Sequence, residues 1–234
     1  MRLTVSAAII SATAALVAAS PATALTLLNS SGSWGTPSGT AYYEFQSTSS
    51  ESQVRWGSPA SVAGTSGLGF TGVGTTSITP GNVFQLGVLQ HFNNPIFGGT
   101  AAESVGLTVA LQFAEIANQT FNFTLDIDET TNDGFCAYYS VTPCADKISW
   151  NNALGDRSFS YAGKQYTLEL SGFKSSPIGD LVADFISQEG GTSTAYLYGQ
   201  IREVPEERST PEPSLMFGLA GFAALGLRRR WVNS

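Results

Sequence analysis

Strict alternation of apolar and polar side chains is the feature that most constrains how this chain can fold. Within Ser104–Phe113 the odd positions are all apolar, and residues 120–128 repeat the pattern. A period of two residues is that of a β-strand with one face buried and the other in water. The two segments therefore predict neighbouring strands, with residues 114–119 as the hairpin connection.

Shorter segments repeat the pattern elsewhere. The glycine-rich stretch 64–81 has Leu68 and Phe70 as its expected inward side chains, and residues 25–39 form either an edge strand or a loop. No segment between residues 25 and 203 shows helical periodicity over ten residues or more. About ten strands at short spacing predict an all-β fold, an antiparallel β-sandwich of the jelly-roll-like or immunoglobulin-like kind. The further expected strands are residues 42–46, 53–56, 83–92, 158–161, 164–170, 181–187 and 193–204.

The N-terminus has the composition of a secretory signal. Arg2 gives a positive start, residues 5–18 are uncharged and largely apolar, and Ala22-Thr23-Ala24 offers an A-x-A cleavage site. A transmembrane helix is the alternative, but the run is short and ends in small residues. We therefore predict a signal-peptide helix over residues 1–24 that is removed on export.

The C-terminus carries three features in immediate succession. A helix over its apolar run would reach roughly 21 Å, short of the ~30 Å hydrocarbon layer, so Ser214 and Trp231 would lie at the interfaces. Clustered arginines stay on the cytoplasmic side, which places the body outside. A buried core helix is the alternative, but its three glycines weaken a soluble helix. The features are Pro211-Glu212-Pro213, the apolar run 214–227, and Arg228-Arg229-Arg230.

Between these ends lies a strongly acidic body. Without Arg2, the terminal arginines and Glu212, the chain keeps 7 basic and 17 acidic residues, a net charge of −10. Such a charge repels nucleic acid and anionic membrane surfaces. Residues 25–203 form the expected β-sandwich body, and residues 204–210 form a polar, proline-containing linker.

The three-part tail resembles the PEP-CTERM sorting signal. In that family Pro211, Glu212 and Pro213 would be the recognised residues and the terminal arginines would set orientation. The resemblance implies a partner, an exosortase-type membrane transpeptidase that removes the tail, acting after the secretion translocon and signal peptidase.

A series of short motifs runs through the body. They are Arg55-Trp56-Gly57, residues 66–70, residues 84–87, residues 91–96, residues 128–132, Cys136 and Cys144 with Pro143 and Asp146, and residues 166–168 with Gly172 and Phe173. In this order, over about residues 55–173, the body resembles the THxN family of PEP-CTERM proteins and the similar choice-of-anchor K domain. Gln90 replaces the Thr of the naming motif while His91 and Asn93 remain, and Thr131 stands where Pro is expected. The resemblance implies an envelope role and no established activity.

Cys136 and Cys144 are the only cysteines. An even pair in an exported chain favours a disulfide, which would stabilise the fold by roughly 2–3 kcal/mol in the chain-entropy model. A zinc site is the alternative, but it would need two more ligands near this pair.

Clustered carboxylates make calcium the one candidate cofactor. The alternative is that the protein has no cofactor. Asp126, Asp128, Glu129 and Asp133 lie close together in the chain, as calcium requires, although their order does not match an EF-hand. Asp126 and Asp128 also fall on the polar face of a strand, where solvated carboxylates are ordinary.

His91 is the only histidine. No catalytic partner is placed beside it in the sequence, so we expect a structural side chain at a strand end, hydrogen-bonded near Asn93. Motifs of serine hydrolases, zinc proteases and phosphate-binding loops are absent from the sequence. Trp34, Trp56 and Trp150 could stack on sugars, but tryptophans of a sandwich are more often core.

These observations predict a non-enzymatic surface or matrix protein that is sorted to the envelope. It would pass the periplasmic side of the inner membrane and then be retained in, or released from, the outer envelope or extracellular matrix, in association with polysaccharide. The alternatives are a calcium-assisted glycan-binding module and a polysaccharide-degrading enzyme, whose paired carboxylates a sequence cannot reveal.

Overall fold

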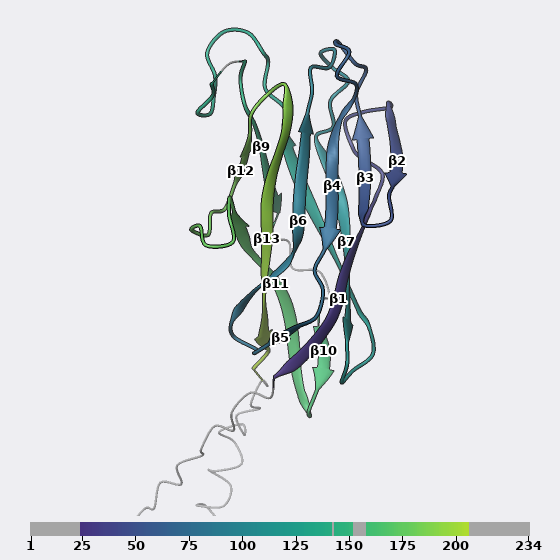
Figure 1. Cartoon of the computed structure of the whole chain (residues 1–234), viewed down its shortest axis with the longest axis vertical. Coiled ribbons are helices and arrows are strands. Elements are labelled where there is room, and N and C mark those ends of the chain that lie inside the picture. Colours follow the sequence, from purple (N-terminus) through teal and green to yellow (C-terminus); the bar gives the residue numbers. More distant parts are fainter. Residues whose placement is uncertain (1–23, 142, 152–157, 206–234) are drawn as a thin grey trace, which may run out of the picture.

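The two alternating segments pair with each other. β7 (Ser104–Phe113) and β8 (Gln119–Asp128) form an antiparallel hairpin in which Val105 faces Leu125 and Leu107 faces Phe123. The computed structural model describes residues 24–141, 143–151 and 158–205 (Figure 1), and this part is all-β, without a helix.

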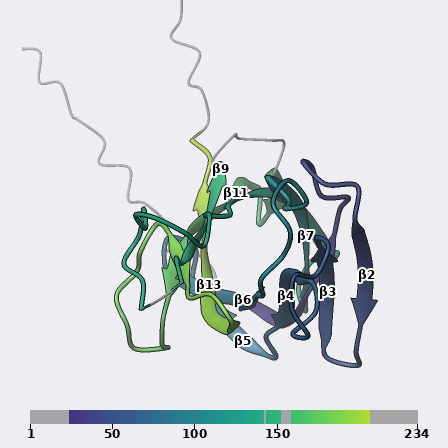
Figure 2. The same ribbon diagram turned by 90° about the horizontal axis from the view of Figure 1, so that it is seen from above.

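Two antiparallel sheets face each other and form a β-sandwich (Figure 2). The six-stranded sheet has the order β12 (Phe185–Ser187), β9 (Asp146–Asn151), β8, β7, β1 (Leu25–Trp34) and β5 (Thr76–Ile78). The seven-stranded sheet has the order β10 (Ser158–Tyr161), β11 (Lys164–Lys174), β13 (Gly191–Glu203), β6 (Val83–Asn93), β4 (Ser66–Gly72), β3 (Glu51–Trp56) and β2 (Tyr43–Ser47). The predicted antiparallel sandwich is confirmed at this level.

Two elements differ from the sequence expectation. Residues 25–34 form β1, which pairs with β7 on one side and β5 on the other and is therefore neither a loop nor an edge strand. β9 was not among the expected strands, because it is short and its inward row begins with a charged residue, Asp146, before Ile148 and Trp150.

The apolar faces of both sheets meet in one continuous core. Leu68 and Phe70 are buried there, as predicted. The Phe70 ring lies between the sheets, because Gly32 of β1 and Gly87 of β6 leave room for it: a Cβ atom at either position would overlap the ring. Small residues on facing strands thus admit one large side chain, which is the usual geometry of a close-packed interior.

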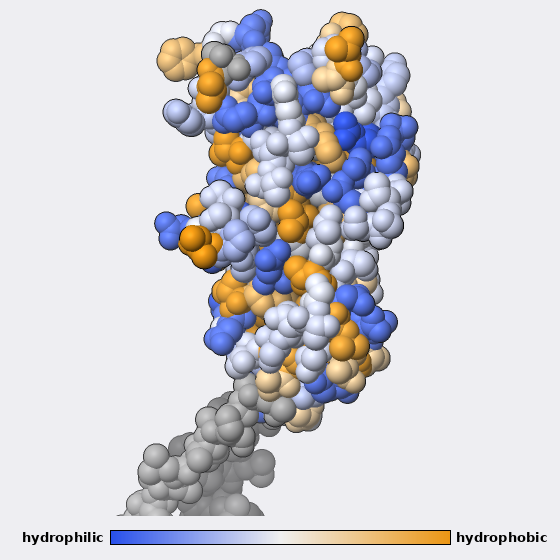
Figure 3. Space-filling view, in the orientation of Figure 1, coloured by the Kyte–Doolittle hydropathy of each residue, from blue (hydrophilic) through white to orange (hydrophobic). Residues whose placement is uncertain are grey.

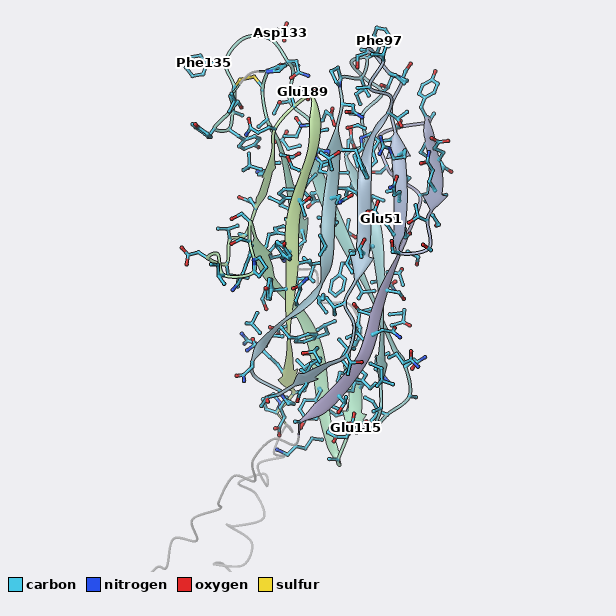
Figure 4. All side chains as sticks on the ribbon, in the orientation of Figure 1. Glu51, Phe97, Glu115, Asp133, Phe135 and Glu189 are labelled. Atoms are coloured by element: carbon cyan, nitrogen blue, oxygen red, sulfur yellow. A yellow bond between two sulfur atoms is a disulfide. The ribbon has the colours of Figure 1, made fainter. Side chains whose placement is uncertain are left out.

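The body begins and ends at one pole. β1 starts at Leu25 and β13 ends at Glu203, and both ends lie at the bottom of Figure 1. At the opposite pole, here called the apex, lie the loops 94–103 and 129–145 and the turn 188–190. Figure 4 shows Phe97, Asp133 and Glu189 at the apex and Glu115 at the other pole.

The expected helices at the two chain ends, residues 1–24 and 214–227, lie outside the described residues except for Ala24. Within the described part of the chain, no helical segment has the length and apolar character that crossing a bilayer requires.

The contact between β1 and β4 gives a test of this packing. A Cβ atom at Gly72 would overlap the Ser30 carbonyl oxygen, whereas a Cβ atom at Gly74 would meet open space. We expect Gly72→Ala to lower the free energy of unfolding by about 1–3 kcal/mol, because backbone atoms cannot turn away as a flexible side chain can. The matched control Gly74→Ala should change it by less than about 0.5 kcal/mol. Urea unfolding measures both, and equal effects would contradict the packing described here.

Candidate functional site

Four strands extend their inward-facing rows into polar residues at the apex. On β6 the buried row that contains Leu89 continues with His91 and Asn93, both fully buried. Because side chains alternate along a strand, these two residues must face the core rather than water. The apolar interior therefore ends in a polar layer.

The other sheet supplies the matching residues. The inward row of β8 ends with Ile127, and Glu129 follows two positions later, largely buried. On β9 the fully buried Asp146 precedes the buried Ile148. After Phe185, the row of β12 continues with buried Ser187 and then Glu189. Three separate strands thus aim polar side chains at the apical end of one core.

We call these residues, with one tryptophan from β3, the apical cluster. Its members are Trp56, His91, Asn93, Glu129, Asp146, Ser187 and Glu189. Nine buried side-chain nitrogen and oxygen atoms in the described part of the chain have no hydrogen-bond partner, and all nine belong to this cluster. Buried polar groups are normally paired, so this concentration of unpaired atoms marks the apex as chemically unusual.

Three members of the cluster lie close enough together to contact the same bound ion or small molecule. One ring nitrogen of His91 and one carboxyl oxygen each of Glu129 and Asp146 lie within 4.8 Å of one another. The Trp56 ring lies beside the His91 ring, with 6.2 Å between the ring centroids and 30° between the ring planes. The group combines one imidazole with two carboxyl groups in a water-poor environment.

Hydrogen bonds fix part of this arrangement and leave the rest open. Thr130 donates to Oδ1 of Asp146 from its backbone nitrogen at 2.8 Å and from its hydroxyl at 3.1 Å. Asn93 donates from Nδ2 to the Ser187 carbonyl at 3.0 Å. The second oxygen of Asp146 and the side-chain oxygen of Asn93 lack partners in the described structure. Asp146 and Asn93 are therefore held in position with one acceptor free.

The surroundings favour the neutral form of every titratable group here. Burial, followed by the nearby carboxyl groups of Asp146 and Glu189, raises the pKa of Glu129 to about 8. Burial and the Glu189 carboxyl raise the pKa of Asp146 to about 7, against the opposing effect of its hydrogen bonds from Thr130. Burial, with an addition from the Arg55 guanidinium, lowers the pKa of His91 to about 3. Two carboxyl groups are thus buried together, and no Lys or Arg of the described residues forms an ion pair with either of them.

A cavity adjoins this cluster at Glu129. It has a volume of about 310 Å³ and lies between loop 94–103 and the segment that follows β8, with Phe97, Glu129 and Asn132 among its lining residues. Glu129 therefore belongs both to the buried cluster and to the cavity wall, and a small solute can approach it.

The disulfide predicted from the sequence is confirmed. Cys136 and Cys144 are joined, with their Cα atoms 5.0 Å apart. The bond constrains loop 129–145, whose first residue is Glu129 and which leads directly into Asp146. Gln188 ties this loop to the β12–β13 turn by accepting from the Val141 backbone nitrogen at 2.9 Å and donating to the Tyr139 carbonyl at 3.1 Å.

The four carboxylates proposed for calcium do not come together. Asp126 and Asp128 lie on the outward face of β8, and Asp133 is exposed at the tip of the apical loop (Figure 4). Asp128 instead accepts a hydrogen bond from the Tyr138 hydroxyl. Only Glu129 belongs to the cluster. It continues the inward-facing row of odd positions, whereas Asp126 and Asp128 occupy even positions that face outward.

The expectation for His91 was wrong in its contacts. We expected a hydrogen-bonded side chain near Asn93, but neither ring nitrogen has a hydrogen-bond partner among the described residues. The sequence also missed Asp146 and Glu189 as neighbours of His91, because they come from distant strands. Of the tryptophans, Trp56 is core and joins the cluster, while Trp34 and Trp150 pack at the edge of the core.

Of the motif residues named by the family resemblance, His91 and Asn93 both belong to the cluster. The sorting residues Pro211, Glu212, Pro213, Arg228, Arg229 and Arg230 lie outside the described residues. No protein-family model matches the chain, and no curated protein matches it either.

Stability should depend on pH through the two raised pKa values. A carboxyl group whose pKa is raised by folding stabilises the native state below its ordinary pKa, and this contribution is lost as pH rises through the native value. Between pH 6.5 and 8 His91 is neutral in the native state, and the unfolded chain, in which its pKa is near 6.5, loses the rest of its proton; this offsets a small part of the loss, so Glu129 and Asp146 dominate the slope. In EDTA we expect the free energy of unfolding to fall by about 2 kcal/mol from pH 6.5 to pH 8, as measured by urea unfolding.

Two variants test the origin of that slope. Glu129→Gln removes a titrating group and should flatten most of the pH dependence. Asp133→Asn removes an exposed carboxylate from the same loop and should leave the dependence unchanged. A wild-type free energy of unfolding that does not change with pH, or equal slopes in wild type and Glu129→Gln, would contradict the assignment of the pH dependence to Glu129 and Asp146.

The disulfide should contribute to stability through its short loop. Reduction, or the double change Cys136→Ser and Cys144→Ser, is expected to lower the free energy of unfolding by about 2–3 kcal/mol. Intact protein and the double variant can be compared by urea unfolding with and without a reductant. If reductant destabilises the serine variant as strongly as the wild type, the effect does not come from this bond.

Proposed function

We propose that the chain is a non-enzymatic surface or matrix protein, exported and sorted to the cell envelope by an exosortase-type system. Its body is a β-sandwich of the jelly-roll-like or immunoglobulin-like kind. The proposal includes removal of residues 1–24 by signal peptidase and cleavage near Pro213. The mature body would then be anchored in the outer envelope or released into the polysaccharide matrix.

The placement of the chain ends supports this proposal most directly. β13 ends at the pole opposite the apical loops, and the sequence then continues through the linker to Pro211-Glu212-Pro213. A body held through that end would present its apex away from the anchoring surface. A protein displayed at a surface needs this orientation, because binding residues lie mainly on loops rather than on the strands that support them.

The surface of the apex fits a role in contact with other molecules. Figure 3 shows apolar side chains at the two apical projections, among mostly polar neighbours. Phe97 and Phe135 lie at these positions in Figure 4 and are strongly exposed, and Tyr139 is exposed in the Phe135 loop. Exposed aromatic side chains are enriched where proteins meet partners.

Two further features favour an exported, non-enzymatic protein. A disulfide between Cys136 and Cys144 is typical of an oxidising compartment. The carboxyl groups of Glu129 and Asp146 converge, but within the core rather than along an open groove where a polysaccharide chain could bind. This arrangement favours a structural role over glycoside hydrolysis, whose two carboxyl groups must flank a bound sugar.

The intact mass of the protein from its host's envelope and medium tests the proposal. We expect a chain that starts at Leu25, ends near Pro213 and lacks Arg228, Arg229 and Arg230. Any additional mass at the new C-terminus would identify the anchor.

A pair of variants makes the test specific to the motif. Changing both Pro211 and Pro213 to Ala should leave the tail attached, while the linker control Pro205→Ala should be processed normally. Wild-type protein that keeps its three arginines would overturn the sorting proposal, since the tail would then be no more than a membrane helix.

A further inference from the structure

We propose that the apical cluster is a binding site for one divalent first-row transition cation, with His91, Glu129 and Asp146 as its ligands. Zn²⁺ is the ion that we take as the probe. This site is distinct from the calcium site expected from the sequence, and it shares only Glu129 with it.

The donor set selects the class of ion. Calcium takes oxygen ligands, whereas an imidazole nitrogen beside carboxylate oxygens suits zinc and its neighbours in the first transition row. His91 offers that nitrogen, fully buried and without a hydrogen bond to any described residue. A buried imidazole with both nitrogens unpaired is costly, and coordination of one nitrogen would remove much of that cost.

The geometry requires only small adjustments. Ligand atoms around a tetrahedral ion at ~2.1 Å lie ~3.4 Å apart, and the three donor atoms already lie within 4.8 Å of one another. Oδ1 of Asp146 is fixed by Thr130, which leaves Oδ2 as the coordinating atom. Hydrogen-bonded support of a ligating carboxylate is a common property of metal sites.

Further acceptors are available to complete the coordination. The side-chain oxygen of Asn93 is buried without a partner among the described residues, and the buried carboxyl oxygens of Glu189 form no hydrogen bond of normal geometry, although the Asn132 side chain lies near them. Glu189 is close enough to influence the pKa of both Glu129 and Asp146. A cation would therefore meet several buried oxygen atoms, and its charge would favour the ionised form of the carboxyl groups, which burial alone disfavours.

The ion would also have a route of access and a clear effect. The cavity of about 310 Å³ is lined by Glu129 and so adjoins the site on the side of that ligand. His91 belongs to the seven-stranded sheet, whereas Asp146 belongs to the six-stranded sheet and Glu129 follows its strand β8. Coordination would thus join the two sheets at the apex, the pole farthest from the chain ends (Figure 1).

Metal content and metal-dependent stability of the full chain test the proposal. The purified protein is stripped with EDTA, dialysed, and titrated separately with Zn²⁺, Co²⁺, Ca²⁺ and Mg²⁺. We expect one Zn²⁺ per chain by elemental analysis and a rise in melting temperature of several degrees. Co²⁺ should give visible absorption bands of a low-coordinate nitrogen and oxygen site, and Ca²⁺ and Mg²⁺ should not raise the melting temperature.

Conservative variants separate coordination from folding. Glu129→Gln and Asp146→Asn should bind Zn²⁺ at least about 100-fold more weakly, while circular dichroism shows a folded β protein in EDTA. His91→Gln should lose the Co²⁺ absorption. Asp128→Asn and Asp133→Asn change exposed carboxylates nearby and should bind as the wild type does.

Three outcomes would overturn the proposal. The first is a wild-type melting temperature that Zn²⁺ leaves unchanged. The second is equal stabilisation of wild type and Glu129→Gln, which would indicate binding elsewhere. The third is stabilisation by Ca²⁺ as large as that by Zn²⁺, since an oxygen-only site would then explain the result.

Discussion

The apolar layer between the two sheets is the interaction on which the rest of this structure depends. Each strand buries one face, so every second residue must be apolar for as long as the strand lies over the core. At the apex that requirement is not met, because His91, Asp146 and Ser187 occupy inward positions and are fully buried. The polar apex is thus held in place by the apolar body beneath it, and its side chains cannot turn to water without separating strands.

Much of the fold could be predicted from alternation, and part of the site could not. The pairing of β7 with β8 follows from their regular odd-position pattern. Glu129 could have been assigned correctly by extending that pattern by one step past Ile127, because both positions face inward. Glu129 was instead grouped with Asp126 and Asp128 as a calcium ligand, because these residues are close together in the chain. Asp146 and Glu189 carried no such signal, since their strands are short and their proximity to His91 is set by tertiary pairing.

The apical cluster illustrates why buried polar groups need a physical explanation. Hydrophobic side chains of similar size would pack at the same positions without unpaired atoms, and such replacements are often neutral or stabilising. A chain that instead retains an imidazole, two carboxyl groups and an amide at these positions bears a cost in the free energy of folding. A ligand that pairs with these groups would offset that cost. The pairing of Asp128 with Lys147 at the end of β8 and β9 brings two of them, Glu129 and Asp146, beside each other.

The pairing of β6 with β13 has a consequence for the order of folding. The β7–β8 hairpin and the Cys136–Cys144 loop close over short stretches of chain, whereas Asn93 pairs with Gly191 only when the last strand reaches the sheet. Short loops close at a lower entropic cost, so local pairs form readily and distant ones slowly. Glu189 and Ser187 arrive with that last strand. The cluster is therefore complete only in a finished molecule, and any ligand that binds it would discriminate between folded chains and chains still folding.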